Sequence, residues 1–221
     1  DEPSVLEESI PTKKEVVEKN QSLVEGVNII DGIPYVYDVN GKLVRSKWYT
    51  TSTGRKTYAD KNGITHINDV WALSDGNYVF GKEGYLIYND WLKTDDGKQA
   101  FAAPKTGKAY SKGSFTVSDG IRYVFDANGY ILKNNWQYEP GYGWSYGRPQ
   151  DGAAYSQGAY TLNDGIRYAF DNYGYLAVNR WIYEPGYGYA FGRPSMGKHD
   201  SGGAAYSQGA YTLNDGIRYA F

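Results

Sequence analysis

The sequence predicts an all-β protein, an elongated β-hairpin solenoid of about nine short hairpins behind a short helical or disordered N-terminal linker. Residues 152–170 recur letter for letter as residues 203–221. A looser repeat, Asp-Gly followed by Tyr-x-aromatic, recurs at intervals of 44, 44, 45 and 51 residues, starting at Asp31, Asp75, Asp119, Asp164 and Asp215. A repeat of this length is typical of solenoids and propellers, whose units stack on their neighbours.

The N-terminal segment, residues 1–26, has a different composition. It is rich in charge and lacks aromatic side chains, and Thr12 to Glu15 matches a helix capping box. Gly26 is a natural helix stop. We expect a weakly amphipathic helix or a partly disordered tether, followed by a repeat domain over residues 27–221.

The first half of each period carries strand and turn signals. Residues 121–125, Ile-Arg-Tyr-Val-Phe, alternate between two faces as a strand does. Asn128-Gly129 then predicts a hairpin turn before residues 130–132. Each such hairpin is expected to end at a tryptophan: Trp48, Trp91, Trp136 or Trp181.

The second half of each period predicts another hairpin. Residues 136–146 centre on Pro140-Gly141, which suits a type II turn, and residues 181–191 repeat the pattern. Residues 48–58 and 91–101 are the counterparts in the first two periods. A period of 44 residues is therefore two hairpins of roughly 22 residues. A propeller blade would also fit this length, but the half-period symmetry favours a solenoid.

Composition excludes several classes of function. The net charge is −2 without a basic stripe, which argues against nucleic acid binding. There is no cysteine, so disulfide and thiol chemistry are excluded. No apolar run approaches the roughly 20 residues of a membrane-spanning helix, so we expect no membrane insertion. The 17% of aromatic residues suits a thin architecture whose side chains stay half exposed.

Residues 120–136, GIRYVFDANGYILKNNW, resemble the cell-wall-binding repeat of choline-binding modules, streptococcal glucan-binding domains and clostridial toxin repeats. The usual form of that repeat is Gly-x-Trp-Tyr-Tyr-Phe-Asp-x-x-Gly, a short run and Gly-Trp. The resemblance extends over residues 27–221. It implies a left-handed hairpin solenoid that binds ligands between successive repeats.

The resemblance also implies where an aromatic cage for choline would lie. Trp48, Trp91, Trp136 and Trp181 match the tryptophan that follows the family's hairpin. The family's first aromatic is replaced by Pro34, Asn77, Arg122, Arg167 and Arg218. Because a guanidinium repels a quaternary ammonium, choline is disfavoured at most sites. Only Trp144 and Tyr189, in the second hairpins, restore an aromatic; Thr57 and Gln99 stand there in the first two periods.

Carbohydrate suits the same residues better. Sugar rings stack on Trp and Tyr, and their hydroxyls pair with Arg, Asp, Asn or Gln. We therefore expect ligand contacts in the third and fourth periods, around the two Glu-Pro-Gly-Tyr-Gly loops. The candidate contacts are Trp136, Tyr138, Tyr142, Trp144, Tyr146, Arg167, Trp181, Tyr183, Tyr187, Tyr189 and Arg218. The alternative for each aromatic is a purely structural role in packing the hairpins.

Catalytic and metal sites find no support in the sequence. Asp-x-Asn-Gly lacks the later glutamate of a calcium loop, and His66 and His199 stand in unlike contexts. Glu139 and Glu184 occupy equivalent positions of successive repeats rather than one cleft. The sequence predicts a non-catalytic module, without a cofactor, on a secreted or cell-surface protein of a Gram-positive bacterium. Its expected partner is a glycan or a wall polymer, including one decorated with choline; the alternative is an adhesin or toxin-type solenoid that binds a host protein.

Overall fold

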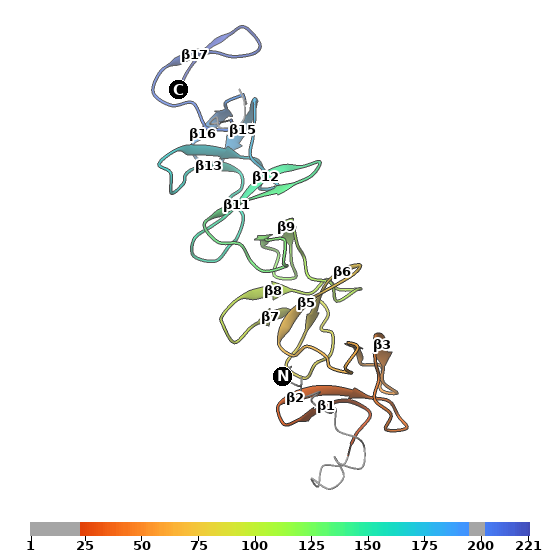
Figure 1. Ribbon diagram of the computed structural model, residues 1–221. Helices are drawn as coiled ribbons and strands as arrows, with labels where there is room; N and C mark the ends of the chain where they lie inside the picture. The colour runs from red at the N-terminus through yellow and green to blue at the C-terminus, as the bar shows by residue number, and fades with distance from the viewer. Residues whose placement is uncertain (1–22, 195–201) are drawn as a thin grey trace, which may run out of the picture.

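The computed structural model describes residues 23–194 and 202–221, which form nine antiparallel two-stranded hairpins. Figure 1 shows that the hairpins follow one another along a single long axis. The strands are β1 (Gly26–Ile30), β2 (Ile33–Tyr37), β3 (Lys47–Thr50), β4 (Lys56–Ala59), β5 (Asp69–Leu73), β6 (Gly76–Phe80), β7 (Trp91–Lys93), β8 (Gln99–Phe101), β9 (Gly113–Thr116), β10 (Arg122–Phe125), β11 (Asn135–Glu139), β12 (Gly143–Gly147), β13 (Gly158–Thr161), β14 (Arg167–Phe170), β15 (Arg180–Glu184), β16 (Gly188–Gly192), β17 (Ala210–Thr212) and β18 (Arg218–Ala220). This confirms the predicted elongated all-β hairpin solenoid.

The residues that lead into β1 contact the first hairpins. Leu23 packs against the cluster around Ile30. Glu25 accepts hydrogen bonds from the Tyr49 hydroxyl at 2.7 Å and from the Ser52 amide at 2.9 Å. Residues 1–22 of the predicted linker lie outside the described residues. Within the described ranges, no helix is long and apolar enough to cross a membrane.

The Asp-Gly pairs, and not the Asn-Gly pairs, lie in the hairpin turns. Ile30 pairs with Ile33, and Asp31 and Gly32 take φ angles of 51° and 83°, as a type I′ turn requires. The Asn40-Gly41 turn instead leads out of the hairpin and forms only the single bridge between Tyr37 and Leu43. The prediction that Asn-Gly closes the hairpin was therefore wrong, because both dipeptides supply the positive φ that a turn needs.

The Pro-Gly hairpins form as predicted. Trp136 pairs with Tyr146 and Tyr138 pairs with Trp144 across β11 and β12. Gly141 has a φ of 87°. The amide of Tyr142 donates to the Glu139 carbonyl at 3.1 Å, which closes a type II turn. Each tryptophan thus lies in the first strand of a Pro-Gly-type hairpin instead of ending the hairpin before it.

One residue with a left-handed backbone precedes each hairpin after the first. These residues are Ser46, Asn68, Asn89, Lys112, Asn134, Gln157, Asn179 and Gln208, with φ angles between 48° and 55°. Such a conformation costs roughly 1–2 kcal/mol for most side chains and is easiest for Asn, which supplies four of the eight. The recurring left-handed residue turns the chain sharply from one hairpin into the next.

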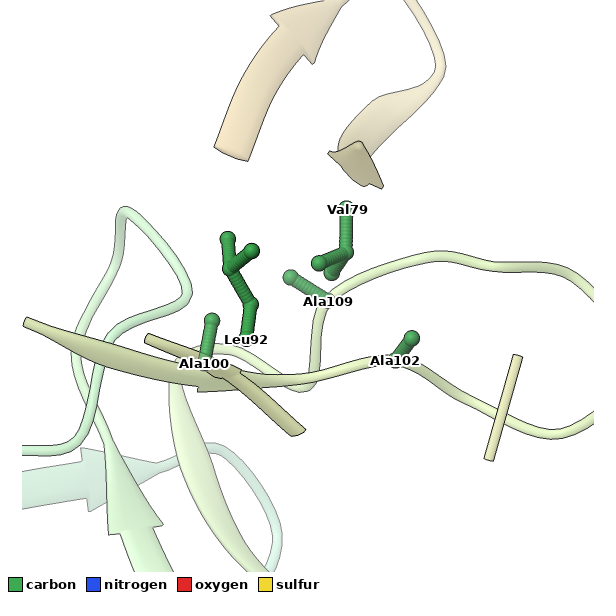
Figure 2. Packing of buried hydrophobic residues seen from close by; sticks show 5 residues of the cluster. All are labelled: Val79, Leu92, Ala100, Ala102 and Ala109. Atoms are coloured by element: carbon green, nitrogen blue, oxygen red, sulfur yellow. The ribbon is translucent and has the colours of Figure 1, made fainter. Parts of the chain in front are cut away.

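The core is a row of small clusters between hairpins. Phe80, Phe125 and Phe170, one in each of the second, third and fourth periods, have 0% exposed surface. Figure 2 shows a cluster of small aliphatic residues in which Val79 of β6 meets Leu92 of β7 and Ala100 of β8, together with Ala102 and Ala109. Since each cluster joins neighbouring hairpins, the stability of the solenoid is distributed along its length.

Three tyrosines at intervals of 45 residues tie distant hairpins together. The amide of Val27 donates to the Tyr85 hydroxyl at 2.8 Å. The hydroxyl of Tyr130 donates to Asp69, and that of Tyr175 donates to Glu139, both at 2.6 Å. These bonds span 58, 61 and 36 residues of sequence, so they brace the solenoid from one period to the next.

Candidate ligand-binding surface

Four tryptophans occupy the same place in alternate hairpins. Trp136 of β11 has its ring centroid 5.0 Å from Tyr146 of its own hairpin. It lies 5.1 Å from Tyr168 and 5.8 Å from Phe170, both on the next hairpin, and stacks on Phe170 at an interplanar angle of 24°. The same arrangement surrounds Trp48, Trp91 and Trp181. We call these four groups the Trp clusters of the first to fourth periods.

In the third period, further rings extend the Trp cluster to the surface. The Trp144 ring lies 6.5 Å from Trp136 and 5.2 Å from Tyr138. Tyr138 is 47% exposed and Trp144 is 46% exposed. We call Trp136, Tyr138 and Trp144 the third-period ring row. The register of β11 and β12 brings these three predicted contact residues together.

The fourth period repeats this row on β15 and β16. Tyr189 lies 6.4 Å from Trp181 and 5.2 Å from Tyr183. The exposed fractions are 38% for Trp181, 52% for Tyr183 and 71% for Tyr189. We call these residues the fourth-period ring row. Because the two rows occupy equivalent registers, both present their rings from the same position on a hairpin.

The loop tyrosines lie apart from the ring rows. Tyr142 stacks on Tyr175 at 5.5 Å and 21°, and remains 68% exposed. Tyr187, its equivalent in the next loop, is 85% exposed. Both predicted contacts are therefore accessible, at the tips of the hairpins that carry the ring rows.

Tyr146 is the predicted contact that the structure buries. Only 2% of its surface is exposed, and its hydroxyl lies 2.8 Å from Asn134 and 3.1 Å from Asn163. Burial raises the pKa of this phenol. Tyr146 belongs to the core, because it faces the adjoining hairpin rather than solvent.

The arginines do not stand beside the Trp clusters as the sequence suggested. Side chains alternate along a strand, so Arg167 and Tyr168 point to opposite faces of β14. Tyr168 meets Trp136, whereas Arg167 pairs with Glu184 at 3.0 Å. Arg218 occupies the equivalent place on β18, next to Tyr219, which meets Trp181. These guanidinium groups are therefore not placed to repel choline from the Trp clusters, as the sequence analysis expected.

The register also corrects the alignment of the first two periods. Thr50 pairs with Lys56, as Tyr138 pairs with Trp144. The residue equivalent to Trp144 is therefore Lys56 and not Thr57, which is fully buried and bonded to Thr65. In the second period Lys93 pairs with Gln99, so Gln99 keeps its predicted place.

Each Trp cluster has a carboxylate at its edge. The tyrosine of the cluster donates its hydroxyl to the aspartate of the hairpin turn at 2.7–3.1 Å, in the pairs Tyr78–Asp75, Tyr123–Asp119, Tyr168–Asp164 and Tyr219–Asp215. Burial, together with the bond to Asp164, raises the pKa of Tyr168 to about 12. This bond explains why the Asp-Gly and Tyr of the sequence repeat recur together.

A second set of stacked rings was missed in the sequence. Two rings five residues apart stack at centroid distances of 4.0, 4.6, 4.4 and 4.3 Å in the pairs His66–Trp71, Tyr110–Phe115, Tyr155–Tyr160 and Tyr206–Tyr211. The motif Ala-Tyr-Ser-x-Gly-x-aromatic at residues 109–115, 154–160 and 205–211 was the available signal. The last three pairs also pack on the buried Phe125, Phe170 and Phe191, so their role is structural.

Three hollows among the described residues lie away from the ring rows. One of about 480 Å³ surrounds Tyr130, with Asp69, Lys98 and Asn128 in its wall. Another, of about 250 Å³, lies beside Trp91. The ring rows instead present exposed rings along a hairpin, which suits an extended chain better than a small molecule that needs enclosure. No group of acidic, histidine or cysteine side chains in the described part of the chain could hold a metal ion.

Comparison with known proteins found no matching family model. A segment of 74 residues, 33% of the chain, is 28% identical to glucosyltransferase-I of Streptococcus downei, and covers 5% of that protein. The solved choline-binding domain of CbpL from Streptococcus pneumoniae matches with a TM-score of 0.53 at 17% identity, over 90% of this chain and 94% of that domain. The chain therefore has the hairpin-solenoid fold of a choline-binding repeat domain, which confirms the resemblance to the cell-wall-binding repeats.

Proposed function

We propose that the chain is a non-catalytic binding module that recognises a glycan or a cell-wall polymer through its third-period and fourth-period ring rows. One observation carries this proposal. Two equivalent hairpins each hold three partly exposed aromatic rings in one register. Packing in the core does not account for rings that remain about half exposed, and exposed apolar rings in groups mark interaction surfaces.

Carbohydrate chemistry fits these rows. A sugar ring offers C–H faces that stack on Trp and Tyr, and hydroxyls that need polar partners at the edge of the stack. The Asp164 carboxylate on Tyr168 and the Asp215 carboxylate on Tyr219 supply acceptors at the edges of the third and fourth Trp clusters. The similarity of part of the chain to a glucosyltransferase supports a glucan among the candidate polymers.

Two weak sites on one rigid solenoid would act together on a polymer. Linked sites raise the overall avidity because the second binding event is intramolecular. The ring rows lie 45 residues apart in the sequence, from Trp136 to Trp181. A repeating polymer that reaches both rows would therefore bind much more tightly than its monomer unit.

Choline on such a polymer is the second candidate. Trp136 and Trp144 lie at an interplanar angle of 85°, and Tyr168 adds a third ring 5.1 Å from Trp136. Several ring faces around one point can hold a quaternary ammonium within about 6 Å of each centroid. The Asp164 carboxylate on Tyr168 adds negative charge to that cluster. The match to a domain named as choline-binding supports this candidate.

We further propose that residues 1–26 are a linker and residues 27–221 the repeat domain, with Leu23 and Glu25 at the end of the linker in contact with the first hairpins. A wall polymer or glycan as ligand fits a secreted or surface location.

The test is a glycan array run alongside a choline column. The variants are Trp144→Ala and Tyr189→Ala, singly and together, with Tyr173→Ala as the matched control because it removes a ring that is 63% exposed outside both rows. We expect the double variant to lose most of the binding and the control to keep it. Binding that neither free sugar nor free choline competes with, and that survives the double variant, would contradict the proposal and favour a protein partner.

A further inference from the structure

In the first-period Trp cluster, the ammonium group of a lysine in the same chain contacts the tryptophan ring. Lys56 stands where Trp144 and Tyr189 stand in the ring rows. Its ammonium nitrogen lies 4.7 Å from the centroid of the Trp48 ring. This distance is within the range of a cation–π contact. The lysine therefore contacts Trp48 from the position that an exposed aromatic ring occupies in the third and fourth periods.

A second lysine covers another ring of the same cluster. The ammonium of Lys108 lies 5.3 Å from the centroid of Tyr78, which packs on Trp48. It also donates to the Asp75 carbonyl at 2.7 Å and pairs with the Asp75 carboxylate at 3.3 Å. The carboxylate that edges this cluster is therefore already neutralised within the chain.

The second and third Trp clusters have neither lysine at the equivalent places. The bridge between Tyr78 and Lys108 corresponds to the bridges of Tyr123 with Ala153 and of Tyr168 with Ala204. Among the described residues, no lysine or arginine lies over the rings of Trp136 or Trp181. The four Trp clusters thus share one core but differ in what occupies their outer faces.

We propose that Lys56 and Lys108 are specificity-determining residues that close the first-period Trp cluster to external ligands by occupying it themselves. Both lysines belong to the folded chain, so their local concentration is in the millimolar range or above, which a weak external ligand does not reach. The inference rests on the proposed function, in which a Trp cluster not covered by the chain's own cations binds ligand. The contacts of Lys56 and Lys108 with the rings do not depend on that function. It removes the first-period Trp cluster from the binding sites, although the core of that cluster matches the cores of the other three.

The experiment uses the full chain labelled with 5-fluorotryptophan, which reports each of the six tryptophans separately by fluorine NMR. Tetramethylammonium chloride is the probe, because it imitates an ammonium without hydrogen-bond donors. The opening variant combines Lys56→Met with Lys108→Ala. The matched control combines Lys56→Arg with Lys108→Arg and keeps both charges. Melting curves show that each variant stays folded.

We expect the probe to leave the Trp48 resonance unmoved in the natural chain and in the arginine control. In the opening variant Trp48 should titrate, with a dissociation constant at least about fivefold below the limit in the natural chain, which corresponds to one exposed cation–π contact. A Trp48 that responds equally in the natural chain, or stays silent in the folded opening variant, would overturn the proposal. Failure of the proposed function would give a different result, in which neither glycan nor choline binds at Trp136 and Trp181.

Discussion

The first and third periods have the same core and different surfaces. In both, a tryptophan packs on a tyrosine of its own hairpin and on two rings of the next hairpin. One of those two rings is a tyrosine, and the other is a phenylalanine that stacks on the tryptophan. The position beside it holds Lys56 in the first period and Trp144 in the third. The comparison shows that the same packing builds the Trp cluster in both periods. The side chain at one strand position, Lys56 or Trp144, then determines what contacts the outer face of the tryptophan.

The hairpin tips differ as well. Arg55 lies 3.7 Å from the Tyr85 ring centroid, Lys98 lies 5.4 Å from that of Tyr130, and Arg122 lies 5.0 Å from that of Tyr175. In addition, the ring of Tyr142 stacks on Tyr175. All three bracing tyrosines thus carry a cation, and Tyr175 is also covered by an aromatic ring that solvent reaches.

The largest expected effect tests whether the two cores are equally well packed. Phe80→Ala and Phe170→Ala each remove a fully buried ring from equivalent hairpins. Each should lower the free energy of unfolding by about 3–5 kcal/mol, through lost burial and the cavity left behind. Urea denaturation followed by circular dichroism measures this, with Ile121→Ala, a residue 44% exposed, as the control. A difference above about 2 kcal/mol between the two variants would show that the halves differ in packing as well as in surface.

The next effect separates stability from binding. Trp48→Ala and Trp136→Ala remove equivalent rings, so their melting temperatures should fall alike. Only Trp136→Ala should weaken binding to the polymer that the array identifies, by about 0.5–2 kcal/mol, a several-fold loss for one ring. Calorimetric titration on folded protein gives the answer. If Trp48→Ala weakens binding more, the ligand site lies in the first period.

A smaller effect concerns the bracing tyrosines of two successive periods. Tyr175→Phe removes a hydroxyl that donates to Glu139 and accepts from Arg122, both at 2.6 Å. The loss should be about 1–3 kcal/mol, as for a hydrogen bond to a charged group. Tyr130→Phe, which breaks the bond to Asp69, is the matched change and should cost the same. Denaturation curves that show no loss for either variant would mean that these bonds do not brace the solenoid.

The smallest effect is a common response of Tyr130 and Tyr168, in successive periods, to alkaline pH. Burial, and then a bond to a carboxylate, raise the pKa of Tyr130 and of Tyr168 to about 12. Since both folded values exceed the ordinary value of about 10, the two phenols add stability below pH 10 that is lost as the pH rises towards 12. Absorbance at 295 nm should show late-titrating phenols, fewer in the Tyr130→Phe and Tyr168→Phe variants. If all tyrosines titrate together near pH 10 while the chain is folded, the prediction fails.

The sequence alone predicted the period, the two hairpins per period and the Pro-Gly turn within residues 136–146. Each of these follows from short-range physics. Turn residues such as Pro140-Gly141 fix a local chain reversal, and alternation along the strands then places every second residue on one face. The resemblance of the repeat added the fold, and the structure confirms it.

Only the tertiary structure decided which turn closes a hairpin, which rings are buried and which side chain covers each Trp cluster. Asp31-Gly32 and Asn40-Gly41 are equally good turn formers, so the choice depends on the strands that then find partners. Tyr146 and Trp144 are both aromatic, and only the neighbouring hairpin makes one of them core and the other surface. Lys56 meets Trp48 because the register of β3 and β4 brings it there. These outcomes depend on contacts with other hairpins, which local sequence patterns do not encode.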